Sequence, residues 1–482
     1  MAAIRDAWRQ GVVAIMLGAS GMLGASGVAN AQSLPASPAS STEKPGQEET
    51  APAKDDDGLL VTAAIRARYE TVGGRPSPDV AAAEQAFLVR TGIALEYGPG
   101  PLTIGGELVD SRGYGIGTRT QIDNGDINAL ELPQAYLKLR LDPGATPLGL
   151  ASVEGGRFLI NLGSGRLVAT DEYRNTVTGF TGVRFDFKPT RTTGVSLFYV
   201  MPQEHLPSGD AEVRRNVVRF DRETLNNVLF GAHITQKQAL GAGQVELAYY
   251  RLAEHDSPGR ATADRRLHTI DARFSRSAQD RGFDYDLEGA YQFGRASESM
   301  RADATNAPMK AGFVHAAAGF TFGGAIKPRL GLFYDYASGN GRQAGAGGTL
   351  HRFDTLFGSR RDDFGPSGTY AALARRNISA PGVRFEAKPA DRFEVLTDYR
   401  GIWLASRYDG FYDLTDPTGR SGRFAGQQVE GRLRYWVIPN RLRLESNFAV
   451  LFKEAFLRNV PEAVARKAST VRFLETNLLV TF

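Results

Sequence analysis

Residues 284–293, Asp-Tyr-Asp-Leu-Glu-Gly-Ala-Tyr-Gln-Phe, alternate between two kinds of side chain. One set is apolar and consists of Tyr285, Leu287, Tyr291 and Phe293, whereas the residues between them are mostly acidic or amide side chains. Successive side chains of a β-strand point to opposite faces of the sheet. This stretch therefore predicts a strand with one apolar and one polar face, as in a sheet that separates lipid from water.

The same alternation recurs from Leu59 to the end of the chain, for example in residues 183–188, 392–400 and 428–437. These segments predict an all-β fold, a transmembrane antiparallel β-barrel of about 18 strands, which is large enough to enclose an aqueous channel. The expected strands begin near residues 59, 86, 101, 130, 151, 180, 192, 227, 243, 268, 283, 312, 328, 377, 392, 426, 441 and 470.

The expected connections alternate between short and long along the chain. Short turns fall at 98–100, 142–144, 188–190, 241–243, 323–325, 388–390 and 439–440. Long polar loops fall at 71–84, 111–129, 162–179, 201–226, 255–267, 297–311, 339–376, 406–425 and 455–469. Outer-membrane barrels have short periplasmic turns and long extracellular loops. A soluble sandwich has no reason to sort its loops by end.

The composition also fits a barrel. The chain has 482 residues and is 42% hydrophobic, and its mean hydropathy of -0.27 is too polar for a helical membrane protein. It nevertheless holds 55 glycines and 10% aromatic residues. It has no cysteine, which excludes disulfides, thiolate metal sites and a cysteine nucleophile.

The amino-terminal residues have the pattern of an export signal. Two arginines precede an apolar stretch, and residues 29–31, Ala-Asn-Ala, form a small-residue cleavage site. The next residues, up to Asp57, are rich in Pro, Ala, Ser and acids, and predict a disordered periplasmic linker. The predicted parts are a signal peptide at 1–31, the linker at 32–57 and the barrel at 58–482.

The chain ends in Phe482, after an alternating segment. A terminal phenylalanine in this context resembles the recognition signal of bacterial outer-membrane proteins, which implies insertion by the barrel-assembly machinery. Together with the export signal and the loop pattern, it predicts a protein of the outer membrane of a Gram-negative-type bacterium, surrounded by the lipid bilayer.

Strand-borne charges are expected to face the lumen, because an arginine or lysine facing lipid at mid-depth costs about 2–4 kcal/mol. The basic residues placed there are Arg90, Lys138, Arg140, Arg157, Arg184, Arg273, Arg384, Arg400, Arg432 and Arg434. Rings of basic side chains select anions in pores, and guanidinium groups bind carboxylates bidentately. The set predicts an anion-favouring lumen. The alternative is that these residues only hold the wall in shape by pairing with acids on the same face, namely Glu96, Glu107, Asp186, Asp271, Glu288, Glu386, Glu394 and Glu430.

Six segments carry a family pattern: Gly106–Arg112, Gly156-Arg157, Gly163–Val168, Arg174–Thr176, Phe180–Arg184 and Phe353–Phe357. They resemble the bacterial alginate export family, outer-membrane porins that include a channel for the polyanion alginate. The resemblance implies an eighteen-strand barrel in which lumen arginines form a positive constriction for uronate carboxylates. Matched by motif, it implies that this constriction contains Arg157, Arg166 and Arg184, and that Glu107 and Asp110 gate or pair. The family pattern has an acidic residue where Thr181 stands, so the chain departs from it there.

The leading hypothesis is a porin that passes an anionic solute or an alginate-like polysaccharide, with no cofactor, no metal and no enzyme activity. A second is an outer-membrane barrel hydrolase, although the sequence has no nucleophile elbow, phosphate loop or zinc motif. A third is a non-conducting or loop-gated structural or adhesin barrel, in which residues 339–376 occlude the pore.

Other charged groups point to no further partner. The net charge of +4 arises from basic residues spread along the chain, which argues against a nucleic-acid patch. The acid clusters at 55–57 and 361–363 lack the spacing of a calcium site, and we expect them to be solvated. The sequence leaves open the solute and the direction of transport. It also leaves open the oligomeric state, since a monomeric porin and a trimeric porin show the same patterns.

Overall fold

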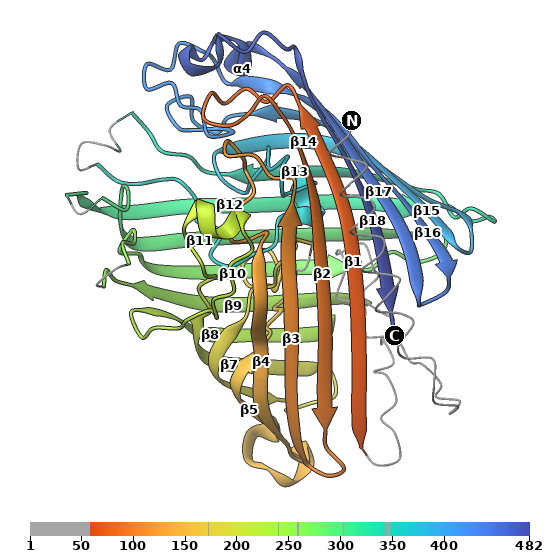
Figure 1. The fold of residues 1–482 in the computed structure, drawn as a ribbon. Helices are drawn as coiled ribbons and strands as arrows, with labels where there is room; N and C mark the ends of the chain where they lie inside the picture. The colour runs from red at the N-terminus through yellow and green to blue at the C-terminus, as the bar shows by residue number, and fades with distance from the viewer. Residues whose placement is uncertain are drawn as a thin grey trace. The chain divides into compact units, whose positions relative to one another are not determined.

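The computed structural model describes residues 58–482, apart from 172, 240, 258, 259, 302, 343 and 345–347. The predicted signal peptide and linker lie outside the described residues. One antiparallel sheet of 18 strands closes on itself, because β1 (Leu59–Gly73) pairs with both β2 (Ala83–Tyr97) and β18 (Thr470–Thr481). Figure 1 shows β1 and β18 side by side. This closed barrel confirms the predicted fold class.

The other strands follow in chain order around the barrel. They are β3 (Leu102–Tyr114), β4 (Asn128–Arg140), β5 (Leu150–Phe158), β6 (Phe180–Phe187), β7 (Thr193–Pro202), β8 (Asn227–Ala239), β9 (Gly243–Glu254), β10 (Arg266–Arg276), β11 (Gly282–Ser297), β12 (Asn306–Thr321), β13 (Arg329–Ala337), β14 (Ile378–Ala390), β15 (Phe393–Trp403), β16 (Phe424–Ile438) and β17 (Leu442–Lys453). Every predicted start lies within three residues of the observed one, except that of β12.

β12 begins six residues before its predicted start at 312, in a segment that contains Pro308. A proline cannot donate to a β-ladder and therefore favours a loop prediction. The segment nevertheless pairs with β11, starting from Asn306 opposite Ser297. The Pro308 carbonyl accepts a hydrogen bond from the Leu350 amide at 2.8 Å, so the backbone of Pro308 faces Leu350 and its missing N–H does not interrupt the ladder with β11.

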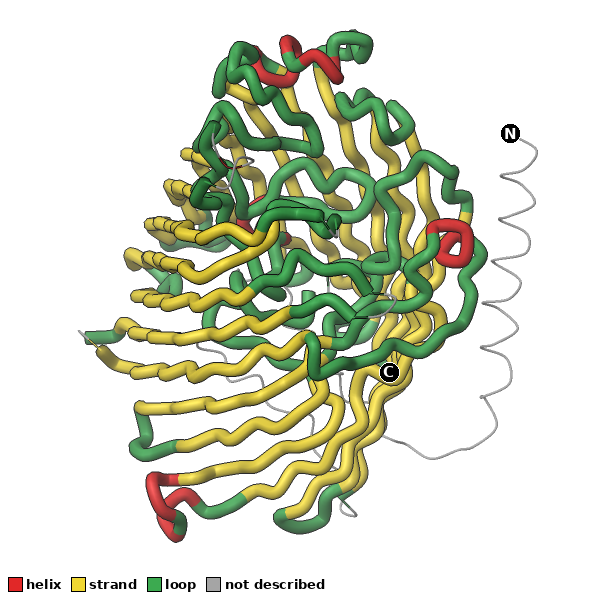
Figure 2. The backbone as a smooth tube through the Cα atoms, turned by 90° about the vertical axis from the view of Figure 1, so that its left-hand side faces the viewer, coloured by secondary structure: helices red, strands yellow, loops and turns green. Residues whose placement is uncertain are grey.

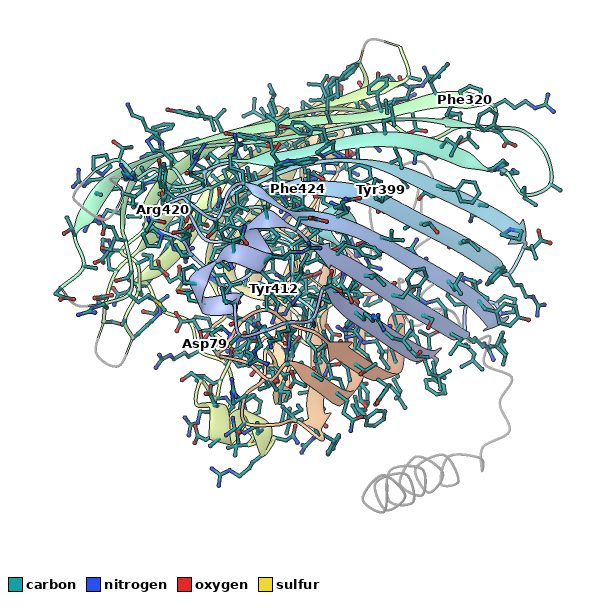
Figure 3. The ribbon with its side chains drawn as sticks, turned by 90° about the horizontal axis from the view of Figure 1, so that it is seen from above. Asp79, Phe320, Tyr399, Tyr412, Arg420 and Phe424 are labelled. Carbon is teal, nitrogen blue, oxygen red and sulfur yellow. The ribbon has the colours of Figure 1, made fainter. Side chains whose placement is uncertain are left out.

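The two faces of the wall differ as the alternation predicts. On β13, Leu330 and Leu332 are 55% and 67% exposed on the outer face, whereas Asp335 on the inner face is buried. Tyr399 and Phe320, labelled in Figure 3, lie on the outer face of β15 and β12. The outer face is therefore an apolar band suited to lipid.

Figure 2 shows loop segments, in green, inside the wall of strands, in yellow. The described parts of two long loops, residues 159–179 and 338–377, fold inward, since their Ile160 and Phe364 are buried in one cluster with strand residues. They are joined by a parallel bridge between Val168 and Phe357, in which the Phe357 amide donates to the Leu167 carbonyl at 3.0 Å. In the described part of the chain, three short α-helices lie in loops, α2 (Asp210–Arg214), α3 (Arg361–Phe364) and α4 (Ala455–Asn459). No helix among the described residues is long and apolar enough to cross a membrane.

Apolar side chains of these loops pack against inward-facing apolar residues of the wall. Ile160 and Phe364 from the loops belong to one buried cluster with Phe158, Phe180 and Phe313 from the strands. Burying a large apolar side chain contributes about 1.5–3 kcal/mol. The loop-facing end of the lumen therefore contains a packed apolar core, which holds the two loops in place.

Candidate functional site

The candidate site is the inner face of the barrel, where the strand register brings most of the predicted charged residues together. Lys138 on β4, Glu154 on β5 and Arg184 on β6 are cross-strand neighbours in one inward row. Arg384 on β14 and Asp398 on β15 are neighbours in another. The predicted site residues on this face are Arg90, Glu107, Lys138, Arg140, Arg184, Arg384, Arg400 and Arg432.

Acidic neighbours bond to several of these cations. The Arg384 Nη2 atom lies 2.7 Å from the Asp398 carboxylate. The Arg184 Nε atom lies 2.9 Å from the carboxylate of Asp186. The inner face therefore carries a network of ion pairs and not a ring of charges of one sign. This agrees with the alternative interpretation of the sequence, in which individual basic residues pair with acids on the same face.

Arg157 does not face the lumen. Its cross-strand partners are Ala135 and Thr181, on the outer face, whereas its neighbour Phe158 points inward and is buried. The Arg157 guanidinium bonds Glu131 at 2.9 Å and Glu223 at 2.6 Å. This placement corrects the prediction made from the family motif. The two residues before it, Gly155 and Gly156, have no side chain, so the sequence does not indicate which residues of this strand face inward.

Asp110 also lies on the outer face. Leu108, two residues earlier on β3, is 48% exposed there, whereas Val109 between them is buried on the inner face. The Asp110 carboxylate pairs with Arg112 at 2.8 Å, two residues along the same face. Asp110 therefore does not line the lumen beside Glu107, because the two lie three positions apart and an odd offset along a strand places side chains on opposite faces. Its pair with Arg112 corresponds to the pairing role that the family resemblance implied as one of two alternatives.

Arg166 lies in the inward loop 159–179 and ties that loop to the wall and to the other loop. Its guanidinium bonds Asp363 on α3 at 2.8 Å, and Glu288 and Asp286 on β11 at 2.5 and 3.1 Å. Arg166 is 4% exposed. It belongs to the predicted site and lines the cavity described below, but its guanidinium is occupied by the carboxylates that join the loops to the strands.

Asp363 is the centre of this buried cluster, which corrects the expectation that Asp363 is solvated. Arg375 from the same loop donates to Asp363 at 2.5 Å, and His315 on β12 lies 3.8 Å from it. Burial alone would raise the pKa of Asp363, but Arg166, His315 and Arg375 together hold it well below its usual value. Asp363 is therefore a permanent anion at neutral pH.

His315, Asp335 and Asp363 have ligand atoms within 4.8 Å of one another, which is close enough to hold a metal ion. Arg166 and Arg375 already bond the Asp363 carboxylate, and Arg400 lies 3.6 Å from that of Asp335. Arginines therefore balance the negative charge of this group, so its donor set does not favour a cation.

Arg400 on β15 is 1% exposed, and its three guanidinium nitrogens make no hydrogen bond to any described residue. The guanidinium lies 4.7 Å from the centre of the Phe333 ring and 5.8 Å from that of Phe364 on α3. Its ion-pair distances to Asp335 and Asp398 are 3.6 and 3.7 Å, longer than hydrogen bonds. It is a buried cation with unused donors beneath an inward loop.

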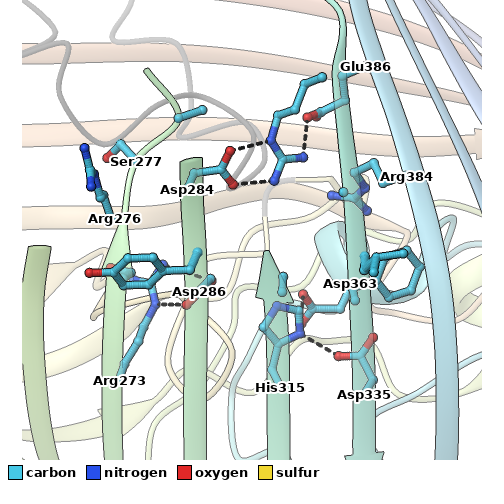
Figure 4. A pocket seen from close by; sticks show the side chains of 18 of the residues that line it. Arg273, Arg276, Ser277, Asp284, Asp286, His315, Asp335, Asp363, Arg384 and Glu386 are labelled. Carbon is cyan, nitrogen blue, oxygen red and sulfur yellow. Dashed lines mark hydrogen bonds and ion pairs between the residues drawn. The ribbon is translucent and has the colours of Figure 1, made fainter. Parts of the chain in front are cut away.

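A cavity of about 130 Å³ lies against the inner face of β10–β14, beside the cluster around Asp363 (Figure 4). Arg329 bridges Asp284 and Glu386 across it at 2.9 and 2.8 Å. Arg273 bonds Asp286 at 2.6 Å. Both signs of charge line this cavity, so it is a polar chamber that suits hydrated or charged solutes.

Sequence reasoning missed four residues that organise the site, namely Arg329, Asp335, Asp363 and Arg375. Arg329 and Asp335 could have been placed on the inner face by the alternation of β13. Asp363 and Arg375 lie in a loop without periodicity, and no signal in the sequence marks them as buried.

A family model described as Alginate export matches residues 89–470. Among solved structures, OccK9 (OpdG) of Pseudomonas aeruginosa is 11% identical with a TM-score of 0.59, over 89% of this chain and 100% of that chain. OpdK of Pseudomonas aeruginosa with vanillate is 10% identical with a TM-score of 0.57, over 88% and 98%. OccK11 (OpdR) is 14% identical with a TM-score of 0.55, over 88% and 96%. No curated protein sequence matches the chain. At these identities the solved structures show a shared fold.

Proposed function

The chain belongs to the alginate export family of outer-membrane barrels, and on that premise we propose that it passes an anionic solute or polysaccharide of the alginate or uronate class through its lumen. A closed barrel of this size with charged side chains on its inner face supports a channel. The coarser conclusion, an outer-membrane porin-type barrel, does not depend on the identity of the solute.

An anionic solute is supported most directly by Arg400, whose buried guanidinium makes no hydrogen bond to any described residue. Arg384 on the next strand and Arg432 on the other side of β15 are on the same inner face. A planar guanidinium binds a carboxylate through two parallel hydrogen bonds. A carboxylate that reached Arg400 would satisfy donors that no described residue satisfies.

The inward loops favour a gated channel. Phe364 covers Arg400, so α3 has to move before a solute can reach this arginine. The same packing supports the second candidate, a barrel that stays plugged and serves as a structural or adhesin protein. The two candidates differ in one property, because only the channel opens while the loop 338–377 is in place, whereas the plugged barrel conducts only after that loop has been removed.

We also infer how the chain reaches the outer membrane and in which oligomeric state it is inserted. We infer that residues 1–31 direct secretion, that 32–57 form a linker, and that the barrel-assembly machinery inserts the chain as a monomer. The family and the structural relatives suggest a non-enzymatic channel.

Planar-bilayer recording tests the proposal. The protein is expected to prefer anions, and Arg184→Glu and Arg400→Gln should each reduce the anion-to-cation permeability ratio several-fold. Uronate oligomers should block the wild-type current at lower concentration than they block the Arg400→Gln current. The matched control is Arg472→Glu, because Arg472 lies on the outer face of β18 between the buried residues Val471 and Phe473.

A second variant tests for a pore in case the wild-type protein is closed. Ala337 and Ile378 are cross-strand partners, so a short Gly-Ser linker can replace the loop between them. Brief anion-selective openings of the wild type that become permanent in this variant support the gated channel. Cation preference in either protein overturns the anionic class, and a wild type that never opens, beside a variant that conducts, overturns the channel in favour of the plugged structural barrel.

A further inference from the structure

Four cationic side chains and one histidine cluster on the outer face of β9–β12, next to the long-loop end of these strands. Arg266 on β10 lies directly opposite Arg295 on β11. One row further from the loops, His268 lies between Arg251 on β9 and Phe293 on β11, and Phe293 is in turn opposite Lys310 on β12. We call this group the rim cluster: Arg251, Arg266, His268, Arg295 and Lys310.

The side chains of the rim cluster point away from the lumen. Their chain neighbours Leu252, Leu267 and Met309 are buried on the inner side of the wall, and adjacent residues of a strand face opposite sides. Arg266, Arg295 and Lys310 are exposed. The cluster therefore faces the outside of the barrel and is not part of the ion-pair network of the lumen.

No carboxylate in the described part of the chain forms an ion pair with any member of the rim cluster. Arg295 donates to the Asn306 side chain at 2.8 Å, and Arg251 donates to the Leu252 carbonyl at 3.1 Å. Like charges directly opposite each other in a sheet are destabilising. The two facing arginines, Arg266 and Arg295, thus repel each other, and no ion pair among the described residues offsets this repulsion.

Two other outward-facing arginines at this end of the barrel are neutralised within the protein. Arg112 pairs with Asp110, and Arg157 pairs with Glu131 and Glu223. The rim cluster differs from these sites because its charges are left for an external anion.

The position of the rim cluster relative to the apolar band identifies the kind of anion. Tyr249, Ile270 and Tyr291 form the next row toward the membrane centre, and they are 37%, 53% and 50% exposed. Tyrosines mark the interface between hydrocarbon and headgroups in membrane barrels. The cations just beyond them lie at the level of the headgroups, where the phosphates of the outer leaflet are found.

We propose that the rim cluster binds the phosphate groups of a multiply acylated, phosphorylated glycolipid of the outer leaflet, of the lipopolysaccharide class. Strands lie about 4.8 Å apart, so four strands present the cations across about 14 Å, which leaves room for two phosphates. Guanidinium groups bind phosphate oxygens bidentately, and a lysine adds a point charge. The acyl chains then lie along exposed apolar residues below, such as Ile270 and Leu287.

The test measures binding of bisphosphorylated lipid A to the purified full-length protein in detergent, by native mass spectrometry. The triple variant Arg266→Gln, Arg295→Gln, Lys310→Gln is expected to bind at least about tenfold more weakly, because each cation near a charged headgroup contributes separately. The matched control is Lys188→Gln, Arg191→Gln, Lys237→Gln, which removes three exposed cations at the short-turn end and should bind like the wild type.

Three results would overturn the proposal. The first is wild-type affinity in the triple variant, and the second is equal binding of fully dephosphorylated lipid by the wild type. The third is competition by inorganic pyrophosphate as strong as that of the lipid itself, which would assign the cluster to a soluble phosphate. Heat-modified mobility on gels checks that each variant is folded. If the triple variant fails to fold, Lys310→Gln alone should weaken binding about threefold, and unchanged affinity there would equally refute the idea.

Discussion

Replacing Arg166 by methionine should release the inward loops from the barrel wall. Arg166 bonds three carboxylates, those of Asp363, Glu288 and Asp286, and is 4% exposed. Removing one partner of a buried ion pair costs about 3–5 kcal/mol, because the remaining charges stay buried without compensation. Undocking returns these carboxylates to water, so most of that cost should appear as a shift of the docking equilibrium by a factor on the order of 10²–10³.

Hydrogen exchange measures this shift directly. The Phe357 amide donates to Leu167, and the Ala169 amide donates to Phe357, so both amides are protected only while the two loops are joined. Their exchange should accelerate by about two orders of magnitude in Arg166→Met, while the strand amides keep their protection.

The matched control is Arg301→Gln, since Arg301 and its partner Asp303 are 78% and 74% exposed and such surface pairs contribute little. If the loop amides of Arg166→Met exchange within threefold of the wild-type rate, Arg166 does not hold the loops.

Three further predictions concern the loop, the wall and the last strand. A carboxyl whose pKa is lowered by folding stabilises the folded arrangement above its ordinary pKa, and this contribution is lost as the pH falls through the lowered value. The open fraction in bilayer recordings should therefore stay constant from pH 8 to about pH 5 and rise only below 3.8, the ordinary pKa of an aspartate such as Asp363; a rise near pH 6 would contradict this account. Gly156→Ala should destabilise the barrel by about 1–3 kcal/mol in urea unfolding, because Gly156 has φ +120 and a Cβ atom would lie 2.3 Å from the Ala135 carbonyl oxygen; a stability equal to that of the wild type would show that the wall relaxes there. Deleting Phe482 should lower the yield of folded barrel in cells but leave urea stability of the refolded protein nearly unchanged, since its side chain is 56% exposed and only its backbone pairs with Ala63; equal yields in cells would argue against a terminal recognition signal.

The strand pattern was predictable because it is local. In residues 284–293 the polarity of each side chain indicates the face of the sheet on which it lies, and the same holds for most strands. The number of strands and the alternation of short and long loops therefore follow from the sequence alone. The prediction failed where side chains carry no such report. Gly155 and Gly156 gave no indication of which face of the strand Arg157 occupies. At Asp110, the two apolar residues before it, Leu108 and Val109, gave no alternation from which its face could be predicted.

The charged inner face was also predictable as a set, because charges are excluded from the lipid side at mid-depth. Which charges pair was not predictable. Arg166 and Asp363 are 197 residues apart, and both lie in loops that have no periodicity. Their contact depends on two loops folding inward and packing apolar side chains against the wall, which is a property of the whole barrel.

The sequence alone therefore determined the closed barrel with its apolar outer face, its charged inner face and its family, since these follow from alternation along single strands and from short motifs. Only the tertiary structure decided how the charges are used. It buried Asp363 between Arg166 and Arg375, left the donors of Arg400 unused, and assembled the rim cluster from four strands. The physical reason is that strand register and loop docking bring together residues far apart in the chain, and a local pattern does not encode either.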